Sequence, residues 1–196
     1  MAMIGLSKPY VAVYANNGGT ISYSSMTTLG RYTNLDISLN DNGSNDFYAD
    51  NGIAESDGSS FSGGTVTVTT DDLTASALVT VLGLTQENIA ATTATTSPKW
   101  QVYGDSQSIP YIGLGGIVKT MVNGAVKYIA VVLNKVLLSN PGLSVATQGE
   151  SIEWQTQQIS GTIYRSDKAD HRWRQVSTPL DSEADAIAAI TSVLGA

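Results

Sequence analysis

The dipeptide Asn123-Gly124 is the feature of this sequence that most constrains its fold. Long runs rich in β-branched residues flank it on both sides, over residues 116–122 and 125–133. Asn-Gly accommodates the two positive φ angles of a type I′ turn, which joins antiparallel strands through a two-residue loop. The sequence therefore predicts a long β-hairpin at this point. The implied opposite pairs are Val122 with Ala125 and Thr120 with Lys127.

Alternation of apolar and polar residues marks further strands. Residues 35–39 and 65–69 alternate at every position. A period of two is typical of a sheet with one dry face and one wet face. Shorter segments of similar character predict additional strands over residues 10–14, 21–24, 151–155, 161–165 and 172–176. The fold class is therefore mainly β.

Two segments have the pattern of amphipathic helices. The first begins at Asp71 or Asp72, either of which is a favoured N-cap residue, and stops at Gly83. The second is predicted over residues 182–194, where acids occupy the first turn and Ala and Ile residues form an apolar face. The apolar stripe of the first helix consists of Leu73, Ala77, Leu78, Val81 and Leu82.

Two connections stand out between the predicted elements. Residues 40–64 are crowded with Asn, Asp, Ser and Gly and predict a long loop, which at this length is usually functional or disordered. Residues 83–98 are small and polar and predict a linker. The length of 196 residues suits one domain, and no repeat of solenoid or propeller period is present. We therefore expect a single domain over residues 1–196.

Composition excludes several classes of protein. The chain has no Cys and one His, so disulfide scaffolds, Cys-based metal sites and thiol nucleophiles are impossible. Residues 1–98 carry two bases and nine acids, a net charge of 2 − 9 = −7, whereas residues 99–196 carry eight of each. An acidic chain does not suit nucleic-acid binding by counterion release, which needs clustered Lys and Arg. No apolar run approaches the length of a membrane span.

Enzyme chemistry finds little support. Residues 41–51 are rich in oxygen ligands, but the EF-hand spacing fails because Gly43 occupies the third position from Asp41. His171 follows Asp170, yet no Gly-x-Ser-x-Gly nucleophile motif accompanies the pair. No P-loop or dinucleotide-binding fingerprint is present. We therefore expect no enzyme, and no catalytic, cofactor or metal residue is predicted.

Three tryptophans lie in or beside predicted strands, at Trp100, Trp154 and Trp173. Aromatic side chains on a sheet face can stack on sugar rings. They also commonly fill cores and interfaces between subunits. A carbohydrate-binding or decoration β-sandwich is therefore an alternative to a purely structural role, and a small hydrolase that uses carboxylates is a third hypothesis.

Four stretches of the chain carry a resemblance to a known family. They are residues 48–55, continued by 61–64 into Asp71; residues 112–115, which enter the Asn123-Gly124 hairpin; residues 147–156, of the form Thr-x-Gly-Glu-x-Ile-Glu-Trp-x-Thr; and residues 161–163. In this order they resemble the major tail tube protein of long, flexible-tailed bacteriophages, particularly those of Gram-positive hosts. The resemblance covers residues 5–190. The family often has Phe in place of Trp154.

The resemblance implies a β-sandwich or barrel with one or two flanking helices. It also implies a structural virion protein whose six copies close into a ring, with rings stacking into a hollow tail tube. The implied partners are other copies, the tape-measure protein, and the tail tip and terminator proteins. Double-stranded DNA passes through transiently without adhering. The protein would be made in the host cytoplasm and reside in the virion, with no membrane contact and no cofactor.

Electrostatics adds an expectation about the inner wall of such a tube. Duplex DNA carries one negative charge per roughly 1.7 Å of its axis. A wall biased toward Asp and Glu repels it within a Debye length of about 8 Å at physiological salt. Some acids of the first half are therefore expected to face the lumen. The candidates are Asp36, Asp41, Asp46 and Asp50.

Overall fold

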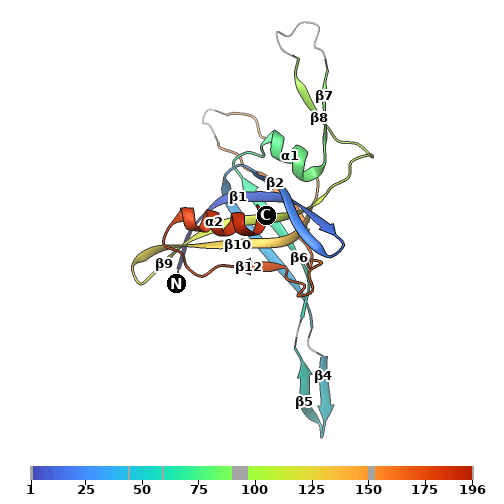
Figure 1. Ribbon diagram of the computed structural model, residues 1–196, viewed down its shortest axis with the longest axis vertical. Helices are drawn as coiled ribbons and strands as arrows, with labels where there is room; N and C mark the ends of the chain where they lie inside the picture. Colours follow the sequence, from blue (N-terminus) through green and yellow to red (C-terminus); the bar gives the residue numbers. More distant parts are fainter. Residues whose placement is uncertain (1, 44, 59, 90–96, 150–152, 196) are drawn as a thin grey trace.

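One large antiparallel sheet dominates the molecule (Figure 1). The computed structural model describes residues 2–43, 45–58, 60–89, 97–149 and 153–195. Seven strands follow the order β2-β1-β9-β10-β11-β6-β3, and β12 also pairs with β10. The bounds of these strands are β1 Ala2–Asn17, β2 Thr20–Thr28, β3 Tyr32–Asn42, β6 Ser60–Thr70, β9 Tyr111–Val122, β10 Ala125–Leu138, β11 Gln157–Ile163 and β12 Arg174–Val176.

The sheet folds over so that strands from its two halves enclose a common core. Val11 on β1 and Val66 on β6 belong to the same cluster of buried residues, although three strands, β9, β10 and β11, lie between β1 and β6 in the hydrogen-bonded order. Across the fold, the Tyr32 hydroxyl on β3 donates a 3.2 Å hydrogen bond to the Gly115 carbonyl on β9. The mainly β prediction is confirmed, because the fold is a large antiparallel sheet with two helices, consistent with a flanked β-sandwich.

The hairpin predicted at Asn123-Gly124 is confirmed together with its register. Val122 lies opposite Ala125, and Thr120 lies opposite Lys127. Asn123 and Gly124 have φ angles of 50° and 80°, as a two-residue turn of this type requires. The hairpin forms the centre of the sheet rather than its edge, because β9 also pairs with β1 and β10 with β11.

The first helix, α1 (Ala75–Leu82), closes one end of this core. Its predicted apolar stripe is buried, and Gly83 ends it in the left-handed conformation with φ 62°. The predicted N-cap was wrong: Thr74 occupies that position and makes no side-chain capping bond. Asp71 is engaged elsewhere, because its carboxylate accepts hydrogen bonds from the main chain and the side chain of Arg31, at 2.8 and 2.5 Å.

The second helix, α2 (Glu183–Leu194), packs on the outer face of β9 and β10 (Figure 1). Ser182 is its N-cap, and the Ser182 hydroxyl accepts a hydrogen bond from the Asp185 amide. Gly113 on β9 makes this packing possible, because a Cβ there would lie 2.4 Å from Leu194 Cδ2. A second buried cluster forms between helix and sheet. The C-terminal helix predicted over 182–194 is therefore present.

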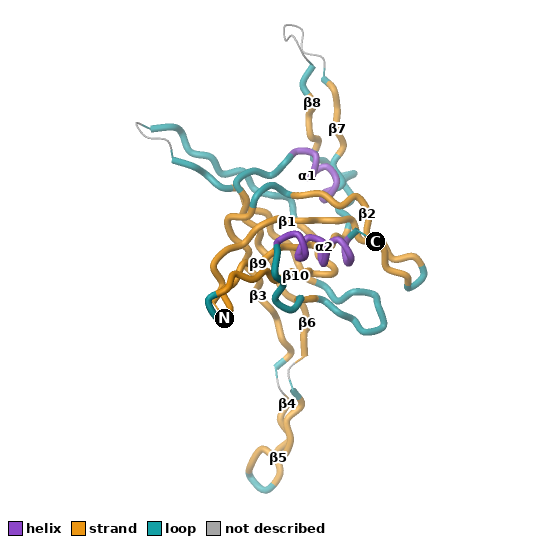
Figure 2. The backbone as a smooth tube through the Cα atoms, turned by 60° about the vertical axis from the view of Figure 1, so that its left-hand side comes forward, coloured by secondary structure: helices purple, strands orange, loops and turns teal. Residues whose placement is uncertain are grey.

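Residues 40–64 are not the predicted loop. They continue β3 and β6 outward into a second hairpin of β4 (Asn45–Ala49) and β5 (Gly52–Asp57), which projects from the body (Figure 2). Asp50 and Asn51 form its two-residue turn with φ angles of 50° and 63°. Asp50 and Asn51, two of the residues that suggested a loop, therefore supply a hairpin turn instead.

Two other predictions are corrected in part. Of the predicted linker over 83–98, residues 85–88 form β7 (Thr85–Asn88), which pairs with β8 (Lys99–Val102), while 90–96 lie outside the described residues. Of the strand predicted over 151–155, residues 151 and 152 lie outside the described residues and 153–155 are not in a strand. The reason is that the partner strand β6 ends at Thr70, opposite Gln157, so earlier residues have no neighbour to pair with.

The other two predicted strands are shorter than expected. The segment expected over 161–165 contributes only its first three residues to β11, and that expected over 172–176 contributes its last three to β12. Neither helix in the described part of the chain is long and apolar enough to cross a membrane.

Candidate assembly surfaces

Large apolar side chains are exposed on three segments that project from the body (Figure 2). We call residues 40–64 the acidic arm, residues 84–103 the β7–β8 hairpin and residues 139–156 the connecting segment. Contiguous exposed apolar surface on a soluble protein usually marks a site of interaction. The side chains are Phe47, Tyr48 and Ile53 on the arm; Ile89, Trp100 and Tyr103 on the hairpin; and Leu143, Val145 and Trp154 on the connecting segment.

The acidic arm and the other two projections leave the body in different directions. In Figure 1 the β4–β5 hairpin extends from one end of the long axis and the β7–β8 hairpin from the other. The connecting segment also lies at the end away from the arm. It leads into β11 at Gln157, which pairs with Thr70 at one end of β6, whereas Gly64, next to the arm, pairs with Ile163. The arm thus extends from one end of the molecule and the other two projections extend from the opposite end.

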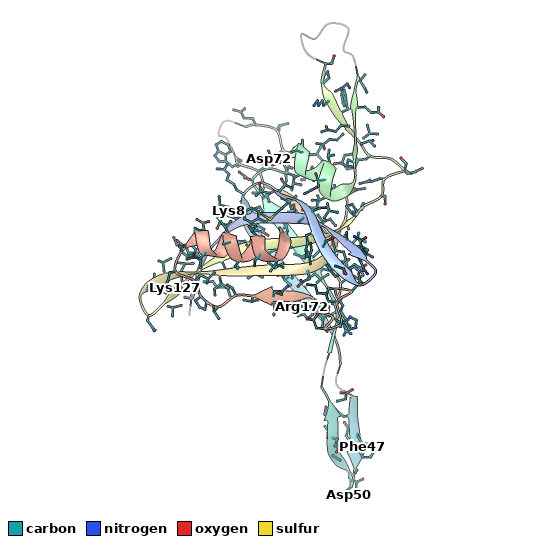
Figure 3. The ribbon with its side chains drawn as sticks, in the orientation of Figure 1. Lys8, Phe47, Asp50, Asp72, Lys127 and Arg172 are labelled. Atoms are coloured by element: carbon teal, nitrogen blue, oxygen red, sulfur yellow. The ribbon has the colours of Figure 1, made fainter. Side chains whose placement is uncertain are left out.

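The arm carries acids and no bases. Residues 40–64 contain four Asp and one Glu and no Lys or Arg. Asp50 lies exposed at its tip and Phe47 lies beside it on β4 (Figure 3). Tyr48 lies opposite Ile53 in the β4–β5 register, so these two apolar side chains form one cross-strand pair. The arm therefore presents apolar groups within a strongly negative surround.

The four predicted lumen acids do not form one cluster. Asp46 and Asp50 are on the arm, and Asp46 accepts a 2.5 Å hydrogen bond from the Ser56 hydroxyl. Asp36 is exposed on β3 in the body of the protein, opposite Thr67. The backbone of Asp41 pairs with Phe61 at the start of the arm, and its side chain lies outside the described part of the structure.

The root of the arm is fixed to the body by an aromatic stack. Phe61 stacks on Trp173 with ring centroids 4.3 Å apart and planes 6° from parallel. The guanidinium carbon of Arg174 lies 4.6 Å from the centroid of the Trp173 ring, and Arg165 donates to the Phe61 carbonyl. Cation–π contacts of this kind stabilise by roughly 0.5–1 kcal/mol at exposed sites. Sequence reasoning missed this contact because more than one hundred residues separate Phe61 from its partners.

A polar cluster joins β1 and β10 to the chain after β11. Lys135 Nζ lies 2.8 and 3.0 Å from the two carboxylate oxygens of Asp167, and the Tyr14 hydroxyl donates a 2.8 Å hydrogen bond to the same group. The bond from Lys135, followed by that from Tyr14, lowers the pKa of Asp167. Burial raises the pKa of Tyr14 to about 12. These side chains are hydrogen-bonded to one another, so the cluster holds the segments together and its role is structural.

The Asp170–His171 pair does not form a catalytic dyad. Asp170 accepts hydrogen bonds from Arg172, which lower the pKa of its carboxyl. The Nδ1 atom of His171 instead lies 3.3 Å from the Ser166 carbonyl oxygen, on an exposed turn where His171 has φ 47°. Across the described residues, no three His, Cys, Asp or Glu side chains approach closely enough to hold a metal ion.

A groove of about 640 Å³ opens between the start of the connecting segment and the start of β11. Trp154, with 92% of its surface exposed, and Leu143 lie along it, and none of the described residues that line it is charged. The groove exists because β10 pairs with β11 only over Gly161–Ile163. After Ser139, whose amide donates a 2.8 Å bond to the Ser160 carbonyl, the chain diverges and leaves the edge of β11 open.

The three tryptophans considered for sugar binding lie in separate surroundings. Trp100 is exposed on β8, Trp154 lies along the groove, and Trp173 is half-buried at the root of the arm. They do not share one sheet face. Comparison of the chain with protein-family models and with curated proteins gave no match.

Proposed function

We propose that this protein is a structural subunit that assembles with its own copies into stacked rings of a hollow tube, as in the phage tail tube proteins that it resembles. The observation that carries the proposal is the presence of apolar projections at two chemically different ends of one subunit. Surfaces that differ in this way form heterologous, head-to-tail contacts, which propagate rather than stop at a dimer.

The edges of the large sheet supply a second direction of contact. In the described residues, β2 and β3 each have one side without a hydrogen-bonded neighbour. Open edges favour pairing with another chain. Such pairing runs across the strands, whereas the arm extends the strands β3 and β6 along their own direction. Contacts in two independent directions are what a subunit needs to tile a surface, and curvature closes that surface into a cylinder.

Sedimentation velocity over a range of protein concentrations tests this proposal. Wild-type protein should form assemblies much larger than a dimer as concentration rises. A variant with Tyr48→Ser and Ile53→Ser should assemble far less, because it loses the apolar pair on the arm. The matched control is Val176→Ser, which removes an exposed apolar side chain from β12 in the body. Wild-type protein that remains monomeric at every concentration contradicts the proposal.

Passage of DNA through the tube is the part of the proposal that concerns charge. Asp36, which is exposed, and the five acids of the arm are six of the nine acids in the first half of the chain, whose net charge is −7. If these acids line the lumen, replacing them with Lys converts a wall that repels DNA into one that binds it. Particles with Asp36→Lys and Asp41→Lys should eject DNA slowly or stall while their tubes stay intact. Unchanged ejection kinetics would exclude lumen placement of these two residues.

A carbohydrate-binding module is the second candidate function, and it is favoured by exposed Trp154 beside a groove whose described lining carries no charge. Titration of the protein with soluble glycans, followed by tryptophan fluorescence, separates the two functions. Saturable binding by a monomeric chain, abolished by Trp154→Ala, would support the module. Assembly without glycan binding supports the tube.

A further inference from the structure

The acidic arm and the groove lie at opposite ends of the same pair of strands. Along β6, Gly64 marks the arm end and Thr70 marks the groove end, where it pairs with Gln157 of β11. Strands rise about 3.3 Å per residue, so these ends are roughly 20 Å apart. A second copy displaced along this strand direction therefore brings its groove end toward the arm of the first. The arm of a chain cannot enter its own groove, because it extends from the other end.

The two surfaces also match in chemistry. The arm presents the Tyr48–Ile53 pair, and the groove presents Trp154 and Leu143, so joining them removes apolar surface from water on both sides. None of the described residues that line the groove is charged, so the acids of the arm meet no like charge from that lining. The exposed amide of Gln158, also in the groove lining, is a hydrogen-bond donor suited to a carboxylate.

The main chain of the groove is open to an added strand. Ser160 directs its carbonyl toward Ser139, and alternation along a strand points the main-chain groups of Gln158 to the same side. No residue of β10 pairs with Gln158 in the described residues. Addition of a strand to an exposed sheet edge is a common mode of recognition, in which main-chain bonds supply affinity and side chains supply register.

From these observations we infer that the groove at the start of β11 holds the β4–β5 hairpin of a second copy, with Tyr48 and Ile53 against Trp154. The inference rests on the proposed function and deepens it, because it assigns the two surfaces that meet when one subunit follows another along the strand direction. The occupant is a second copy of this chain, and the contact repeats without closing on itself.

Disulfide trapping tests this contact, since the chain contains no Cys. The full-length variant with Tyr48→Cys and Trp154→Cys should form a ladder of covalent multimers on mild oxidation. Each single substitution can give at most a dimer. The matched control combines Tyr48→Cys with Val176→Cys, at an exposed apolar site on β12. All three positions are exposed, and circular dichroism checks that each variant folds.

The outcomes separate the inference from the proposed function. A ladder from the Tyr48/Trp154 pair alone supports the arm–groove contact. Tubes that form while this pair gives no ladder, or gives no more than the control pair, overturn the contact and leave the proposed function standing. Wild-type protein that stays monomeric overturns the proposed function itself.

A mixing experiment gives an independent readout. A Tyr48→Ser, Ile53→Ser chain keeps its groove, and a Trp154→Ser chain keeps its arm. Neither should stack alone, but a mixture retains one intact contact and should give assemblies two layers deep in electron micrographs. A mixture that assembles no further than its separate components contradicts the inference.

Discussion

The β9–β10 hairpin and the β4–β5 hairpin use the same local design in opposite surroundings. Each reverses direction through two residues with positive φ, Asn123-Gly124 in one and Asp50-Asn51 in the other. Every residue of β9 from Ile112 to Ile117 is buried, whereas every residue of β5 is exposed. An isolated two-stranded hairpin is marginally stable in water at best. Turn residues therefore specify both hairpins, but only the β9–β10 hairpin is stabilised by packing against the rest of its own chain.

This difference identifies the role of the apolar residues in each hairpin. Leu114 on β9 contributes to the core, and its burial stabilises the fold. Phe47, Tyr48 and Ile53 have no core to join, so their apolar surface can be buried only against another molecule. We therefore expect substitutions in the first hairpin to change stability and substitutions in the second to change assembly.

The largest expected effect tests this contrast directly. Leu114→Ala should lower the free energy of unfolding by about 2–5 kcal/mol, because it leaves a cavity in the core. Ile53→Ala should change it by no more than about 0.5 kcal/mol, as for most exposed positions, while weakening self-association. Urea unfolding and sedimentation of both variants provide the measurements. Equal destabilisation by the two substitutions would refute the contrast.

A second prediction concerns the packing that holds the central hairpin. Gly113→Ala should lower the free energy of unfolding by about 1–3 kcal/mol, since the added Cβ would lie 2.4 Å from Leu194 Cδ2 and 2.7 Å from Tyr23 Cε1. Gly104→Ala is the control, because apart from its chain neighbours no heavy atom of the described residues lies within 4 Å of the position of its Cβ. Thermal unfolding distinguishes the two. Wild-type stability in Gly113→Ala would show that helix α2 packs differently on β9.

The sequence predicted the elements whose signals are local. Asn123-Gly124 determined a turn and its register, and the first-turn acids and apolar face of residues 182–194 determined a helix. The arm was missed because both of its faces meet water, so its strands lack the alternation of apolar and polar residues that marks a half-buried sheet, and they resemble a polar loop. The helix cap was missed because Asp71 is engaged by Arg31, which lies forty residues away.

The candidate site was less accessible to sequence reasoning. The sequence pointed to the acids of the first half as a group. It did not point to Phe47, Tyr48 and Ile53, which form the apolar surface of the arm. Apolar residues ordinarily indicate a core. Only the register of β4 and β5, and their distance from the body, show that these three are exposed. The groove depends on where β10 stops pairing with β11, which no local pattern records.

A smaller effect is expected at the root of the arm. Trp173→Ala removes the stack on Phe61 and should cost about 0.5–1.5 kcal/mol beyond the loss of buried area. The arm should then be cleaved faster by proteases, while the rest of the chain is cleaved at the wild-type rate. Limited proteolysis with mass spectrometry measures both rates. A general increase in cleavage would assign Trp173 to the core rather than to the arm.

The smallest effect concerns pH and the body of the protein. Hydrogen bonds from Lys135 and Tyr14 lower the pKa of Asp167, so their stabilisation is complete above the unfolded value of about 3.9 and is lost as pH falls through the folded value. Because Asp167 is partly exposed, these interactions stabilise the fold by no more than about 1 kcal/mol. Asp167→Asn should therefore be destabilising in urea at pH 7 and nearly neutral at pH 2. If the difference in unfolding free energy between wild type and Asp167→Asn were the same at pH 2 and at pH 7, the stabilising role of the charged Asp167 would be contradicted.

Negative-stain electron microscopy of the purified full-length protein at high concentration is the most direct test of the whole account. We predict hollow, regularly banded cylinders from wild-type protein, and their loss when Tyr48 and Ile53 are both replaced by Ser. Micrographs that contain only dispersed single particles at every concentration, with no rings and no cylinders, would contradict it.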